Sequence, residues 1–202
     1  MAAVILASAG CTLREFQELP VLLELDEDLS DPELSGILAA VDEWNLLAGN
    51  RLVEPGPIFT VVGTHNDDFD ERDLGDGVHR IYRIGENNGD TAYLEEENGP
   101  LVGYGTLSDV LIFLGAYDQW TQNDDVNDSD EWRATYVFNG AHHEFGHLLG
   151  IAHYNCRFGE MNTRGDAFRE PRESLAEADL DAFCIVYDCR CGEPNRDRQV
   201  YP

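Results

Sequence analysis

The chain has 202 residues, 43% hydrophobic and 10% aromatic, and its 40 acidic residues against 13 arginines and no lysine give a formal net charge of −27. This length and apolar content suit one domain with its own core and exclude an intrinsically disordered chain. No apolar run reaches the roughly 18 residues that a membrane-spanning helix needs, and the negative charge excludes a nucleic-acid-binding protein, which requires a basic surface.

The N-terminus combines a short apolar run, small residues and a cysteine at position 11. This order resembles the end of a bacterial lipoprotein signal, whose cysteine receives the lipid. A lipid anchor at Cys11 is one interpretation, and a frayed apolar terminus is the other. The other four cysteines are an even number, which favours disulfides and predicts an extracellular or cell-envelope protein.

Residues 21–62 are predicted to form a strand, a helix and a second strand, in that order. Apolar residues alternate over residues 21–25, which is typical of a strand. Ser30 begins a predicted helix with a capping box and a proline in its first turn. Apolar side chains then repeat at helical spacing up to Trp44, and Gly49 is the expected stop. Residues 58–62 predict a strand that is buried on both faces.

The middle of the chain predicts shorter elements. The acidic, turn-rich residues 66–76 are expected to form a loop, and residues 79–84 and 91–94 to form the two strands of a hairpin. Residues 110–114 predict a third strong strand. Residues 123–131 then form a run of oxygen-bearing side chains, which could bind Ca²⁺ or could be an acidic loop at a helix N-terminus, where negative charge is favoured.

Two more helices are expected, over residues 131–150 and 174–187. Ser174 and Glu177 would form the capping box of the second of these helices. The chain shows no internal repeat and no low-complexity linker, so we expect one compact domain of the α+β or α/β class.

The helix over residues 131–150 carries the chemistry. His143 and His147 are four residues apart, so both side chains project from one face. Glu144 lies about 100° further round the axis, within reach of a water on a shared cation. If the glycine at position 150 adopts a positive φ, the helix ends there and His153 can return as a third imidazole. Three neutral imidazoles suit Zn²⁺ with a fourth position open, as catalytic sites require.

Such a site predicts hydrolysis of a peptide bond. Bound zinc lowers the pKa of its water towards about 7, and Glu144 would take the proton as general base and pass it to the leaving amine. His142 points elsewhere on the helix and is not an expected ligand. A purely structural zinc site fits less well, because such sites are closed by four protein ligands and would leave Glu144 without a purpose.

Residues 143–153 read HEFGHLLGIAH, which resembles the long zinc signature of the metzincins, HExxHxxGxxH. Met161 follows at a suitable distance for the methionine turn that this family places beneath the metal. The closest resemblance is to the matrixins, in which Trp44 late in the first helix and residues 180–187 in a short C-terminal helix also agree. The resemblance is strong only over residues 141–161.

The resemblance implies an α+β fold of the metzincin type. Its parts would be a twisted, mostly parallel sheet with an antiparallel edge strand, two long helices, and a small C-terminal subdomain with the methionine turn and one helix. An extended protein or peptide substrate would pair with the edge strand, which we expect near residues 103–106. We therefore expect a signal remnant over residues 1–11, a monomeric catalytic domain over residues 12–191, and a tail over residues 192–202.

Two predictions concern the C-terminal cysteines, of which Cys156 is not a matrixin feature. A bridge from Cys156 to Cys184, Cys189 or Cys191 would pin the C-terminal subdomain, and two bridges among these four residues allow three pairings. Residues 190–195 resemble the matrixin cysteine switch, so Cys191 could cap the zinc as a latency switch. The alternative is that Cys191 is a disulfide partner.

Three other functions compete with a zinc endopeptidase. A catalytically silent zinc- or peptide-binding protein on the same fold would have no need of the base Glu144. A ribosome-maturation endonuclease also groups three histidines, but it lacks this glutamate, and its polyanionic substrate would be repelled by a charge of −27. A calcium-binding adhesive module would rest on the acidic loops alone.

Overall fold

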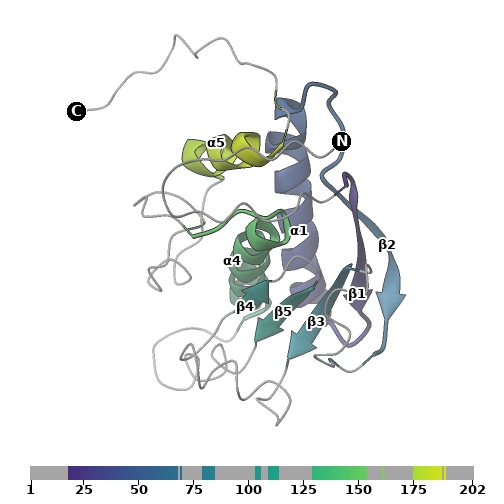
Figure 1. Ribbon diagram of the computed structural model, residues 1–202. Coiled ribbons are helices and arrows are strands. Elements are labelled where there is room, and N and C mark those ends of the chain that lie inside the picture. Colours follow the sequence, from purple (N-terminus) through teal and green to yellow (C-terminus); the bar gives the residue numbers. More distant parts are fainter. Residues whose placement is uncertain are drawn as a thin grey trace, which may run out of the picture.

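The computed structural model describes residues 18–67, 69, 79–84, 103–105, 109–113, 129–153, 161, 175–187 and 189. The strands are β1 (Val21–Asp26), β2 (Phe59–His65), β3 (His79–Ile84), β4 (Gly103–Gly105) and β5 (Val110–Phe113) (Figure 1). The helices are α1 (Asp31–Leu47), the short 3₁₀ helix η1 (Gly49–Arg51), α4 (Asp130–Leu148) and α5 (Glu177–Val186).

The five strands form one sheet in the order β2-β1-β3-β5-β4. Neighbouring strands run parallel except for β4, which pairs antiparallel with β5 at one edge. The predicted α+β fold, with a mostly parallel sheet and one antiparallel edge strand, is confirmed. The edge strand also lies where the sequence places it, within residues 103–106.

Helices α1 and α4 lie side by side against the sheet, and α5 lies across one end of this pair (Figure 1). Alternate residues of β1 face the core, so Leu23 is fully buried while its neighbour Leu22 is 50% exposed. Trp44 of α1 joins the three helices. Its indole nitrogen donates to the carbonyl oxygen of His142 in α4 at 3.0 Å, and its ring lies 6.3 Å from that of Phe183 in α5. None of the helices in the described part of the chain combines the length and apolarity needed to cross a membrane.

Two strand predictions are wrong. Residues 58–62 were expected to be buried on both faces, but β2 is an edge strand and its Val62 is 54% exposed. Residues 79–84 were expected to begin a hairpin, but β3 pairs in parallel with β1 on one side and β5 on the other. Both edges of β3 are therefore occupied by parallel neighbours. The predicted partner, residues 91–94, lies outside the described residues.

The helix boundaries follow local chemistry. The backbone N–H of Ser30 donates to the carboxylate of Glu33 at 2.8 Å, as the predicted capping box requires, and α1 ends close to Gly49. The predicted cap of α5 is wrong. The backbone N–H of Ala176, the residue just before α5, donates to the carboxylate of Asp179 at 2.9 Å. Glu177 instead forms a surface ion pair with Arg51 at 2.9 Å.

A buried carboxylate joins the sheet to both long helices. Glu33 of α1 is fully buried, and its oxygens lie 2.8 Å from Nε of Arg83 on β3 and 3.1 Å from Nη1 of Arg133 on α4. Burial alone would raise the pKa of Glu33. The hydrogen bonds from Arg83, Ser30 and Arg133 and the charge of Arg83 outweigh burial, so the pKa lies below its ordinary value. The sequence identified Glu33 only as a capping residue.

We expect Glu33→Gln to lower the free energy of unfolding by about 3 kcal/mol, because it removes the buried carboxylate that pairs with Arg83 and Arg133. This value is at the lower end of the stability losses found when a buried ion pair is broken, because Arg83 and Arg133 remain 28% and 23% exposed. Urea unfolding measures the change. The matched control is Asp31→Asn, an exposed acid in the same first turn, which should change the free energy by less than about 0.5 kcal/mol.

The contribution of Glu33 should also depend on pH. Because its pKa is lowered in the folded protein, the unfolded chain binds the proton first as the solution is acidified. The stabilisation is therefore fully present above the ordinary glutamate value of about 4.3 and is lost as the pH falls through the lower value of the folded state. Urea unfolding of parent and Glu33→Gln should show a stability difference that narrows in acid. A difference independent of pH would contradict the assignment.

Candidate metal centre

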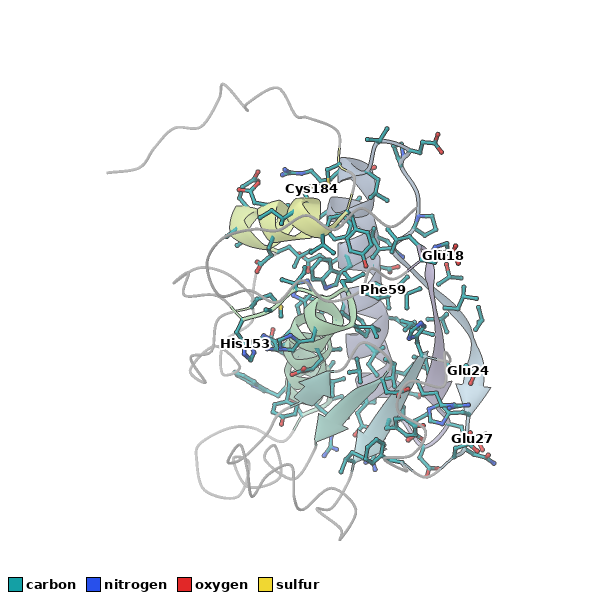
Figure 2. The ribbon with its side chains drawn as sticks, viewed as in Figure 1. Glu18, Glu24, Glu27, Phe59, His153 and Cys184 are labelled. Carbon is teal, nitrogen blue, oxygen red and sulfur yellow. A yellow bond between two sulfur atoms is a disulfide. The ribbon has the colours of Figure 1, made fainter. Side chains whose placement is uncertain are left out.

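Three histidines meet at the carboxyl end of α4. Nε2 of His153 lies 3.0 Å from Nε2 of His143 and 3.0 Å from Nε2 of His147. One possible ligand atom from each residue lies within 4.8 Å of the other two. Figure 2 shows the His153 ring beside α4. His143 is buried, His147 is half-buried and His153 is exposed, so the nitrogens converge where the interior meets the solvent.

The third histidine reaches the other two because the chain reverses at Gly150. This residue has a φ of 82°, a conformation that glycine adopts at little cost. Its N–H donates to the carbonyl of His147 at 2.8 Å, and the N–H of Ile151 donates to the carbonyl of Gly146 at 2.9 Å. These two bonds form a Schellman motif, which ends a helix and turns the chain. The predicted positive φ at Gly150 is confirmed.

The same turn orients the ring of His147. Its Nδ1 lies 2.9 Å from the carbonyl oxygen of Ile151, and because a carbonyl only accepts, Nδ1 carries the proton of this bond. In the neutral ring, Nε2 is then the nitrogen whose lone pair can bind a metal, and it is Nε2 that lies 3.0 Å from Nε2 of His153. A backbone bond of this kind is the usual support of a metal-binding histidine.

The donor set fits a metal ion. A tetrahedral zinc with bonds of about 2.0–2.1 Å places its nitrogen ligands about 3.3 Å apart, close to the 3.0 Å from His153 to each of the other two histidines. One proton shared between two of these rings cannot satisfy three converging nitrogens, whereas a cation can accept a lone pair from each. Within the described residues, these three form the sole cluster of histidine, cysteine or acidic side chains that could hold an ion.

The residues beside the ligands have distinct surroundings. Glu144 follows His143 on α4 and its side chain is buried, with 5% exposed. His142 lies on another side of the helix, as expected from the helical spacing. Its ring is fully buried, stacks on Phe138 at 4.9 Å and places Nε2 3.5 Å from a carboxylate oxygen of Glu43 on α1.

Met161 is fully buried and lies against α4. A Cβ added at Gly146 would overlap with the sulfur and terminal methyl of this methionine. The methionine side chain therefore occupies the space that glycine leaves on the helix between His143 and His147. A methionine turn at Met161 stays a prediction of the sequence.

The structure also shows a role for Asp179, which the sequence does not predict. The carboxylate of Asp179 on α5 accepts the N–H of Met161 at 3.2 Å and the N–H of Ala176 at 2.9 Å. Its position in the first turn of a predicted helix was a usable signal, but the capping role was given to Glu177. Nothing in the sequence indicates the contact with Met161, which lies 18 residues earlier.

The remaining site predictions fall partly outside the described residues. Cys184 and Cys189 form a disulfide, so of the pairings left open for the four C-terminal cysteines only Cys156 with Cys191 could form a second bridge. Both of these residues lie outside the described part, as does most of the predicted calcium-binding stretch over residues 123–131. Calcium binding by this stretch stays a prediction of the sequence.

Comparison with known proteins identifies the fold of this chain but no sequence family to which it belongs. The sequence matches no family model and no curated protein. The structure is similar to the crystal structure of archaemetzincin from Methanopyrus kandleri, with a TM-score of 0.53 and 12% sequence identity, covering 82% of this chain and 93% of that one. At this identity the similarity concerns the fold alone, and the protein has an α+β fold of the archaemetzincin type.

Proposed function

We propose that the protein is a zinc-dependent endopeptidase of the metzincin type. The observation that carries the proposal is the convergence of three imidazole Nε2 atoms at the end of α4, where Glu144 follows His143 in the sequence. His143, His147 and His153 would hold the zinc, and Glu144 would be the general base. The similarity to a protein named archaemetzincin supports this level of assignment. The finer resemblance to matrixins stays a prediction of the sequence.

The residues divide the chemistry between them. Bound zinc would supply the Lewis acidity that activates a water and polarises the substrate carbonyl. His147, held by its bond to the carbonyl of Ile151, keeps its lone pair directed at the centre. Glu144 would hold the proton of the attacking water and deliver it to the leaving amine nitrogen. The low exposure of Glu144 supports this role, because a carboxylate shielded from bulk water interacts more strongly with a bound reactant.

The sheet offers a place for an extended substrate. In the described part of the chain, β4 is an edge strand whose one partner is β5, and it runs antiparallel to the rest of the sheet. α4 also packs against β4, so this edge lies beside the helix that carries the histidines. A peptide that pairs with a sheet edge gains main-chain hydrogen bonds regardless of its sequence. Protein or peptide substrates therefore fit this site.

We propose an extracellular or cell-envelope location for the protein. The disulfide between Cys184 and Cys189 supports an oxidising compartment. A lipid anchor at Cys11 and a latency role for Cys191 remain predictions of the sequence.

We expect the protein to bind one zinc ion per chain. His147→Ala and His153→Ala should each weaken zinc binding by more than about 100-fold, since loss of a ligand exceeds the loss of an outer-shell partner. Competition with a chromophoric chelator measures the affinity. The control is His79→Ala, which removes a histidine of β3 outside the cluster and should leave the affinity unchanged. Parent protein that binds no zinc would refute the proposal.

We expect Glu144→Gln to retain zinc and to lose activity on a peptide library by about 10²–10⁴-fold, the usual contribution of a general base. The matched control is Glu131→Gln, an exposed glutamate in the first turn of the same helix. Cleavage profiling of parent, both variants and chelator-treated protein provides the measurement. If the parent binds zinc but cleaves no peptide, the chain is instead a silent binding protein on this fold.

A further inference from the structure

Asp179 is a fully buried carboxylate that the proposed reaction does not use. One of its oxygens accepts the backbone N–H of Met161 at 3.2 Å, and the other accepts that of Ala176 at 2.9 Å. A carboxylate is expensive to bury unless hydrogen bonds replace its hydration. The second bond caps the first turn of α5. The first bond ties α5 to a residue that packs against the metal-binding helix.

Met161 is held from two sides. Its main chain is bound to Asp179, and its side chain fills the space beside Gly146 on α4. Gly146 lies three residues after His143 and immediately before His147, so the sulfur lies against the part of the helix that carries both residues. A shift of the Met161 main chain would therefore move the side chain that supports this face of α4.

α5 is itself well anchored. The N–H of Leu175, just before the helix, donates to the carboxylate of Glu43 on α1 at 3.0 Å. Glu177 in its first turn pairs with Arg51 at 2.9 Å. The bridge Cys184–Cys189 closes its far end. Asp179 therefore lies on a helix whose beginning is tied to α1 through Glu43 and to η1 through Arg51.

We propose that Asp179 is a positioning residue for the metal centre. By holding the N–H of Met161, it keeps the thioether pressed against α4 and thereby fixes the spacing of His143 and His147. This inference rests on the proposed function. The carboxylate is required because it offers an acceptor to each of two N–H groups, whereas an amide has one oxygen and would direct its NH₂ at one of them.

The test must separate this role from simple capping of α5. Loss of a cap lowers the stability of the protein without the metal, but it does not by itself change the affinity or the geometry of the metal site. The two readouts that distinguish the roles are therefore the zinc dissociation constant and the visible absorption of the cobalt-loaded protein, which reports ligand geometry. Unfolding of the metal-free protein provides the third measurement.

We expect Asp179→Asn in the full chain to weaken zinc binding by about 10–100-fold, the usual effect of losing an outer-shell partner, and to alter the cobalt spectrum. Asp181→Asn is the matched control, because it makes the same chemical change at an exposed position two residues further along α5. It should leave both readouts as in the parent. If Asp179→Asn fails to fold, Asp179→Glu, which keeps the carboxylate on a longer side chain, replaces it with the same expected direction.

A double-mutant cycle tests whether Asp179 acts through Met161. In a Met161→Ala background, most of the effect of Asp179→Asn on zinc affinity should disappear, because the side chain that transmits it is gone. Two results would overturn the proposal: additive losses in the cycle, or a variant with the zinc affinity and cobalt spectrum of the parent and only a lower stability. In either case the proposed function would still stand if the parent binds zinc and cleaves peptides. A parent that binds no zinc would remove both.

Discussion

The three-histidine cluster depends on a reversal of the chain at the carboxyl end of α4. Two of its rings lie on one face of the helix, as any pair spaced by four residues does. The third arrives because Gly150 adopts a positive φ and two backbone bonds close the turn behind it. The carbonyl of Ile151, the next residue, then fixes the ring of His147. This single turn therefore ends α4, brings His153 back to the other two histidines and fixes the tautomer of His147.

The rest of the fold holds α4 in place along its length, with a buried carboxylate near each end. Near the start of the helix, Glu33 connects Arg133 to Arg83 on the sheet. Further along, Trp44 binds the main chain of His142, and near the end Asp179 holds Met161 beneath the helix. In a chain with a net charge of −27, these few buried acids act as internal acceptors and charge partners rather than as a solvated surface.

The sequence predicts what is local and misses what depends on distant partners. The bounds of α1, the φ of Gly150 and the meeting of the histidines follow from capping residues and helical spacing within about a dozen residues. The edge strand β4 came from a family resemblance. The neighbours of β3 and the exposure of Val62 depend on strand order, which no local pattern contains. Likewise, Glu33 and Arg83 are 50 residues apart, so their ion pair exists only once helix and sheet have packed.

X-ray absorption at the zinc edge tests the central claim most directly, because it counts and identifies the atoms bound to the metal. The protein loaded with one zinc ion should show three nitrogen scatterers at about 2.0–2.1 Å, with the multiple-scattering pattern of imidazole rings, and one oxygen from water. A sulfur scatterer at about 2.3 Å would mean that a thiolate closes the site, and fewer than three imidazoles would mean that the histidines do not share one ion. Either result would contradict an open, three-histidine centre.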